Sequence, residues 1–210
     1  VGYMLRYHDG FARIVNWAQN EVLGDVFFVR AHMSTHIDED YRRKIARDHV
    51  GGIMFDLGGH VLDQIIYLLG RPGKVSSFLR NDGIQIPGFA DNTLAVFEFE
   101  RAMAIIDIAA LESRPMARRF EVYGTNGSAI ILEPFEPGHQ MRLCLEEPRE
   151  GYSSGAHVLS IRGRSRQQLY ELELKAFLAA VRGEQPPDRS LDHELLVQES
   201  LLRATDHLSG

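Results

Sequence analysis

The chain has 210 residues, of which 44% are hydrophobic and 25% charged, and its net charge of −6 argues against a general nucleic-acid binder. No apolar run approaches the roughly 18 residues of a membrane span, and no signal peptide is visible. The single cysteine, Cys144, excludes an internal disulfide and favours the cytoplasm. We therefore expect a cytoplasmic globular protein of one large domain or two small ones.

The N-terminal part is predicted to alternate strands and helices. Residues 3–7 form a strand-like run. Apolar residues at positions 11, 14, 15, 18 and 22 then keep the spacing of an amphipathic helix that ends at Gly24. Residues 25–35 are predicted to be a strand, and the highly charged residues 37–49 an exposed loop or a short helix. A central helix is expected from about Gly52 to Leu69.

The rest of the chain is predicted to be mostly strands, followed by two helices. Two β-like segments are separated only by Glu100 and Arg101, which indicates a tight hairpin. Gly124 and Gly127 are predicted to flank a second hairpin turn. The predicted strands are residues 75–79, 93–99, 103–111, 120–123, 128–132 and 141–145. A polar loop is expected at 146–166, and helical faces at Tyr170, Leu174, Phe177, Val181 and at Val197, Leu201, Ala204, Leu208.

This order of elements predicts an α+β fold, with an open, largely antiparallel sheet that carries helices on one face. The strands at 93–99 and 103–111 are apolar on both faces. Because too few helices are available to cover both sides of such a sheet, we expect the free face to pair in a homo-oligomer, a dimer or a tetramer.

Asp56, His60 and Asp63 are the most informative residues of the chain. In a helix, spacings of four and three place all three side chains on one face, among apolar residues that belong in a core. A histidine flanked by carboxylates is a candidate proton-transfer group, although such a cluster is also common as a purely structural one. Gly58 and Gly59 favour function, since glycine inside a helix costs about 1 kcal/mol and indicates a close approach to its surface.

Other polar clusters carry weaker signals. His32, His36, Asp38 and His49 invite a metal interpretation, but they form no compact ligand motif, and we expect no metal site. The basic residues 42–44 and Arg114, Arg118 and Arg119 are interpreted as solvated loop charges.

Several stretches in the same order resemble the C-terminal domain of the Gfo/Idh/MocA family of oxidoreductases, named for glucose–fructose oxidoreductase, inositol dehydrogenase and rhizopine catabolism. They run through nearly the whole chain, so residues 1–210 are interpreted as one substrate-binding and oligomerisation domain. The stretches are Tyr3 to Tyr7, Leu23 to Val26, Gly51 to Pro72, Tyr123 to Ser128, Glu173 to Val181 and His193 to Ala204.

The resemblance implies that His60 takes a proton from a substrate hydroxyl as hydride leaves for the nicotinamide, with Asp56 polarising it or binding substrate. Arg6, His36 and Asp63 are the candidate substrate-binding residues, although Asp63 also suits a structural role and Arg6 a surface salt bridge. The substrate would be a sugar, a polyol or a related hydroxy compound.

The residues that bind the cofactor are expected to lie outside this chain. No G-x-G-x-x-G motif follows a predicted strand, and the Glu-Lys-Pro lysine of the resembled family is absent. The chain also begins in a strand-like run without a methionine. We therefore expect a piece of a longer enzyme that uses NAD or NADP, inactive alone and without a nucleotide-binding Rossmann domain of its own.

Two other classes of function stay open. A non-enzymatic ligand-binding or assembly scaffold would use the sheet but has no use for a titratable pair beside helix glycines. A metal-dependent lyase or isomerase would use the histidines as ligands.

Overall fold

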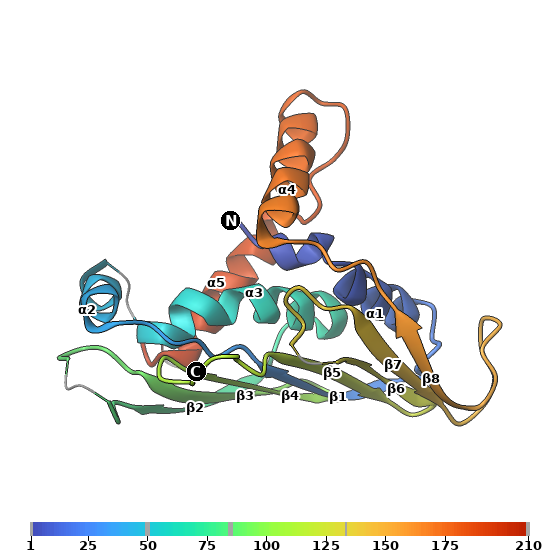
Figure 1. Cartoon of the computed structure of the whole chain (residues 1–210), viewed down its shortest axis with the longest axis horizontal. Helices are drawn as coiled ribbons and strands as arrows, with labels where there is room; N and C mark the ends of the chain where they lie inside the picture. Colours follow the sequence, from blue (N-terminus) through green and yellow to red (C-terminus); the bar gives the residue numbers. More distant parts are fainter. Residues whose placement is uncertain (1, 49–50, 84–85, 133, 209–210) are drawn as a thin grey trace.

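The computed structural model describes residues 2–48, 51–83, 86–132 and 134–208. One eight-stranded sheet organises this part of the chain (Figure 1). Its strands are β1 (Val26–His32), β2 (Lys74–Arg80), β3 (Asn92–Glu98), β4 (Met103–Ala109), β5 (Arg119–Gly124), β6 (Gly127–Ile131), β7 (Gln140–Leu145) and β8 (Gly155–Ser160). The helical elements are the 3-10 helix η1 (Met4–Tyr7) and the α-helices α1 (Asp9–Gln19), α2 (Glu39–Asp48), α3 (Gly52–Leu69), α4 (Arg166–Val181) and α5 (Leu191–Ala204).

The predicted α+β class, with an open and mostly antiparallel sheet, is confirmed. The strand order is β2-β3-β4-β1-β5-β6-β7-β8, in which β1 and β4 are parallel and the other neighbouring strands are antiparallel. Helices α1, α3 and α5 lie over one face, and no helix of the described residues lies on the opposite face (Figure 1). Alternating residues of β3 follow this division, because Ala95 and Phe97 are buried while Leu94 and Val96 are partly exposed.

The sheet departs from a simple meander at a single place. The β3–β4 and β5–β6 hairpins form as expected, but β1 lies between them and pairs with both β4 and β5. The spacing of apolar residues indicates which segments are strands. It does not indicate that β1 pairs with strands about 75 to 95 residues later in the chain, as it does with β4 and β5.

Two local predictions also differ from the structure. Tyr3, Met4 and Leu5 are all buried, so they lack the in-out alternation of a strand, and the segment coils into η1. The polar segment 146–166 contains β8, an edge strand without a buried residue, which pairs only with β7. Because β8 is held by backbone hydrogen bonds rather than by an apolar face, hydrophobic periodicity does not reveal it.

The predicted helix of Tyr170, Leu174, Phe177 and Val181 exists as α4, but its apolar face is not in the core. These four side chains are between 45% and 67% exposed, and α4 rises away from the sheet (Figure 1). None of the helices in the described part of the chain has the length and apolar character needed to cross a bilayer.

Candidate functional site

Helix α3 carries the predicted site, and its bounds agree with the predicted helix. The two glycines serve a close approach, as expected, although side chains rather than a backbone make it. A Cβ on Gly59 would lie 2.9 Å from Cε1 of Tyr3 and 3.2 Å from Cδ1 of Leu201. Gly58 lies against Met54 and Leu201 in the same way. The glycines therefore allow η1 and α5 to pack directly on the surface that displays His60.

His60 is half-buried beside Tyr3, with ring centroids 5.9 Å apart and an edge-on geometry. Its Nδ1 is buried and has no hydrogen-bond partner among the described residues. Burial, followed by the positive charges of Arg166 and Arg118, lowers the pKa of His60 to about 4, against a smaller opposing effect of Asp63. The ring is therefore neutral at pH 7 and has a nitrogen lone pair that can accept a proton.

Asp63 and Arg6 come together in a buried network. Arg6 donates from Nε to Oδ2 of Asp63 at 3.0 Å and from Nη2 to Oδ1 at 2.6 Å, and His193 Nε2 lies 2.8 Å from Oδ1. Gln64 donates to Oδ2 at 2.8 Å, and Arg6 also contacts Glu194 at 2.7 Å. Protein side chains thus occupy both oxygens of Asp63, which favours the structural role over the predicted contact with substrate.

Burial of Asp63 alone would raise its pKa, but the hydrogen bonds from His193 and Arg6 have the larger combined effect and lower the pKa below its usual value. Asp63 is therefore ionised at neutral pH, and the ion pair with Arg6 is fully formed there.

The two remaining predicted residues lie at the margins of this region. Asp56 is half-buried on α3, and its negative charge raises the pKa of Tyr41 on α2. His36 is exposed and lies in an isolated bridge with Leu111, and its carbonyl oxygen accepts a hydrogen bond from Arg114 at 3.4 Å. The direct contribution of Asp56 and His36 to the site stays a prediction.

The histidines of the metal interpretation do not gather in one place. His32 lies on the uncovered sheet face between Asp107 and Glu112, with ring nitrogens 2.5 Å and 2.8 Å from their carboxylate oxygens. His49 lies outside the described residues. Within the described ranges, no group of three or more His, Cys, Asp or Glu side chains is placed to hold a metal ion.

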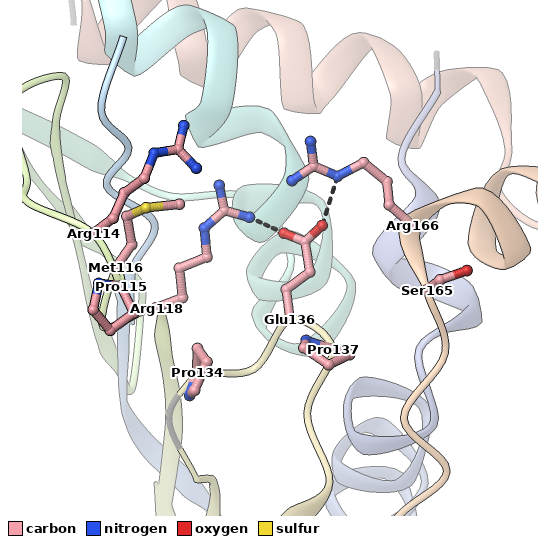
Figure 2. Close-up of a pocket in the computed structure, with 9 residues that line it drawn as sticks. All are labelled: Arg114, Pro115, Met116, Arg118, Pro134, Glu136, Pro137, Ser165 and Arg166. Atoms are coloured by element: carbon pink, nitrogen blue, oxygen red, sulfur yellow. Dashed lines mark hydrogen bonds and ion pairs between the residues drawn. The ribbon is translucent and has the colours of Figure 1, made fainter.

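A cavity of about 910 Å³ lies near His60 and joins three distant segments of the chain (Figure 2). The segment before β5 contributes Arg114 and Arg118, the β6–β7 connection contributes Glu136, and the start of α4 contributes Arg166. Glu136 Oε1 accepts a hydrogen bond from Arg166 Nε at 2.6 Å, and Oε2 pairs with Arg118. In Figure 2 the guanidinium groups of Arg114, Arg118 and Arg166 turn toward the space around Glu136.

The interpretation of Arg118 as a solvated loop charge is wrong, because this residue is only 4% exposed. Arg42, another residue taken as solvated, is also buried, at 6%. Sequence reasoning missed the group of Arg118, Glu136 and Arg166 because no short spacing links three segments that meet only in the folded sheet. The one available signal was the concentration of arginines before β5.

The low pKa of His60 gives a direct test of this geometry. In the isolated chain the ring is expected to titrate near pH 4, well below the ordinary value of about 6.5. Since the folded pKa is lowered, the stability that this neutral ring confers is complete above about pH 6.5 and is lost as the pH falls toward 4.

Proton-detected NMR titration of the His60 ring measures this value, and an Arg166→Gln variant should raise it because one of the two repelling charges is removed. A midpoint at or above 6.5 in the unmodified chain would contradict the described environment.

Comparison with known proteins shows which proteins share this fold. The sequence model of the GFO/IDH/MocA C-terminal domain matches residues 11–130. No curated protein matches the chain. Many solved structures do match it, with sequence identities low enough that the likeness is one of fold.

Three of these structures show the extent of the match. An oxidoreductase from Agrobacterium radiobacter in complex with NAD+, L-tartaric acid and magnesium has 14% identity and a TM-score of 0.80, covering 99% of this chain and 61% of that one. A levoglucosan dehydrogenase in complex with NADH and levoglucosan has 15% identity and a TM-score of 0.80, covering 99% and 63%. An oxidoreductase from Thermotoga maritima has 20% identity and a TM-score of 0.71, covering 99% and 60%.

The chain therefore spans about three fifths of the length of these solved structures. The family model covers more than half of the chain, and the sheet with its helices on one face is shared with the solved oxidoreductases. On this evidence the chain belongs to the GFO/IDH/MocA family and has the fold of its C-terminal domain.

Proposed function

We propose that this chain is the substrate-binding domain of an NAD- or NADP-dependent oxidoreductase that acts on a sugar, a polyol or a related hydroxy compound. His60 carries the proposal, because it is a neutral imidazole whose buried Nδ1 has no partner among the described residues, and it feels the charges of two arginines that line a large cavity. Oxidation of an alcohol needs a group that takes the hydroxyl proton as the hydride leaves. The NAD+ and NADH complexes among the similar structures support the choice of cofactor.

In this proposal the residues of the chain bind and orient the substrate, and the nicotinamide, when bound, accepts or donates the hydride. His60 holds the hydroxyl proton, and Tyr3 and the glycine pair of α3 fix the ring on its helix. Asp56 polarises His60 or contacts the substrate. The cofactor lies on a nucleotide-binding domain outside this chain, and the described residues supply one wall of the site.

Turnover measurements test the division of labour between the two domains. The 210-residue chain alone is expected to show no nicotinamide-dependent oxidation of any member of a sugar and polyol panel, since it lacks a dinucleotide-binding motif. The chain joined to its nucleotide-binding domain should oxidise at least one of them. Turnover by the isolated chain, monitored as NADH or NADPH absorbance, would overturn the proposed partition.

We also propose that the uncovered sheet face pairs with a second copy of the chain. This face presents partly exposed apolar side chains on adjacent strands, including Phe28, Phe78, Leu94, Val96 and Ile105. The Phe78 side chain is 65% exposed. A contiguous apolar surface of this kind is characteristic of an interface.

Light scattering on a sizing column should give the mass of a dimer or a tetramer, and a Val96→Lys variant should shift the mass toward the monomer. A monomeric mass for the unmodified chain would rule out this assembly. It would also remove the main support for a scaffold function.

A further inference from the structure

The cavity near His60 holds an excess of positive charge. Three arginines and one glutamate line it, so these four side chains leave a net charge of +2 in a chain whose total is −6. The excess is therefore a local feature that the composition of the whole chain does not predict. A pocket with such an excess attracts anions.

Of the three arginines, Arg114 and Arg166 are exposed and Arg118 is buried. Its side chain is 5% exposed, and its Nε has no hydrogen-bond partner among the described residues. Its backbone φ of +36° lies in the left-handed region, which is uncommon for a residue with a side chain. Burial, then the charges of Arg166 and Arg114, lower the pKa of Arg118 to about 10. The protein thus keeps a buried cation, paired with Glu136, at a strained backbone position, as functional sites often do.

Glu136 shows how these guanidinium groups bind a carboxylate. Arg166 donates to one oxygen and Arg118 pairs with the other, so each oxygen receives one arginine (Figure 2). Among the described residues, Arg114 donates one hydrogen bond, to the carbonyl oxygen of His36 at 3.4 Å, a weak contact. The N-terminus of α4, capped by Ser165, also borders the cavity and favours negative charge there.

We propose that this cavity binds a carboxylate of the substrate, so that the enzyme acts on hydroxy acids such as sugar acids rather than on neutral sugars. This inference rests on the proposed function, because it names the substrate class of the same site. Arginine is suited to the role, since its planar fork binds carboxylates in a bidentate fashion. The same arginines also attract a phosphate, so the test compares binding of the two anions.

The expected orientation of the bound substrate follows from the positions of the charged side chains. The arginines hold the acid end of the substrate, and the same positive charges, through Arg118 and Arg166, act on His60. A bound carboxylate would neutralise part of this charge. The pKa of His60 should therefore rise when the acid binds, which brings this pKa closer to the pH at which the enzyme works.

Calorimetric titration of the 210-residue chain with matched ligand pairs tests the proposal. The pairs are glucose with glucuronate, galactose with galacturonate, and mannose with mannuronate, and glucose 6-phosphate serves as the phosphate probe. At least one acid should bind about 10- to 100-fold more tightly than its neutral partner, as expected for charge-assisted hydrogen bonds. Equal binding within every pair, or tighter binding of the phosphate than of every acid, would overturn the proposal.

Three variants locate the binding site. Arg118→Gln should abolish the preference for the acid. Because Arg118 is buried and its loss can unfold the chain, Arg166→Gln gives an independent test, since this side chain is 52% exposed. The preference should fall in Arg166→Gln and persist in Arg182→Gln, a control on the same helix region with a 65% exposed side chain. An undiminished preference in Arg166→Gln would exclude this cavity.

The His60 titration and the turnover assay separate this inference from the proposed function. If acids bind as expected and raise the pKa of His60, but the chain joined to its nucleotide-binding domain has no nicotinamide-dependent activity, the carboxylate site stands and the proposed function fails. If the joined protein turns over neutral polyols as well as acids, the proposed function stands and the carboxylate preference fails.

Discussion

A His60→Gln variant of the complete enzyme is expected to lose about 100- to 10,000-fold in kcat, the usual contribution of a general acid or base. Glutamine approximates the size and polarity of the imidazole but cannot take up a proton. The edge-on packing against Tyr3 and the glycine pair should tolerate it, so the loss would report chemistry rather than folding. Steady-state kinetics under saturating substrate and cofactor measure the effect.

The pH profile distinguishes the base from a residue that only supports the site. Because the pKa of His60 is about 4 in this chain, the acidic limb of kcat/KM should lie below pH 6 in the unmodified enzyme and be absent from His60→Gln. His207→Gln is the matched control, since His207 is exposed and follows the last helix. Full activity of His60→Gln would refute the acid–base role.

An Asp63→Asn variant is expected to lose about 3–5 kcal/mol of unfolding free energy, which is typical when one partner of a buried ion pair is removed. Asp63 is fully buried and the Arg6 side chain is 10% exposed, so the substitution leaves a cation without its main partner. His193 also loses a charged contact at 2.8 Å. Urea denaturation of both chains at pH 7 measures the difference.

The control for this variant is an exposed ion pair of equal length. Arg71 and Glu199 are 2.6 Å apart, with side chains 60% and 38% exposed, and Glu199→Gln should cost about 0–1 kcal/mol. The cost of Asp63→Asn should also shrink in acid. The pKa of Asp63 is lowered in the folded chain, so its contribution is complete above the unfolded value of about 3.9 and is lost as the pH falls further. Equal losses in the two variants would contradict a buried network.

The sequence was sufficient to locate helix α3 and the residues that it displays. Eighteen residues with a continuous apolar pattern, two internal glycines and a terminal glycine specify a buried helix closely packed by its neighbours. Hairpins with short connections were equally readable, since β3 with β4 and β5 with β6 are adjacent in the chain. These features depend on interactions within a few residues.

The features that the sequence did not reveal depend on contacts between distant segments. Arg118, Glu136 and Arg166 belong to three separate connections, and only the folded sheet brings their charges together. The burial of Arg118 likewise follows from its surroundings and not from its neighbours in the sequence. Residues 3–7 were misassigned for a related reason, because this segment packs against α1, α3 and α4 rather than in the sheet.

The position of β1 at the centre of the sheet has a consequence for the newly made chain. Phe28 lies opposite Met103 on one side and Tyr123 on the other, so β1 is made long before either of its partners. The strands β2 to β4 and β5 to β8 pair with neighbours in the sequence, whereas β1 pairs with β4, which ends at Ala109, and with β5, which ends at Gly124. In the newly made chain, joining the two halves of the sheet therefore depends on contacts between distant segments, which form more slowly than local hairpins.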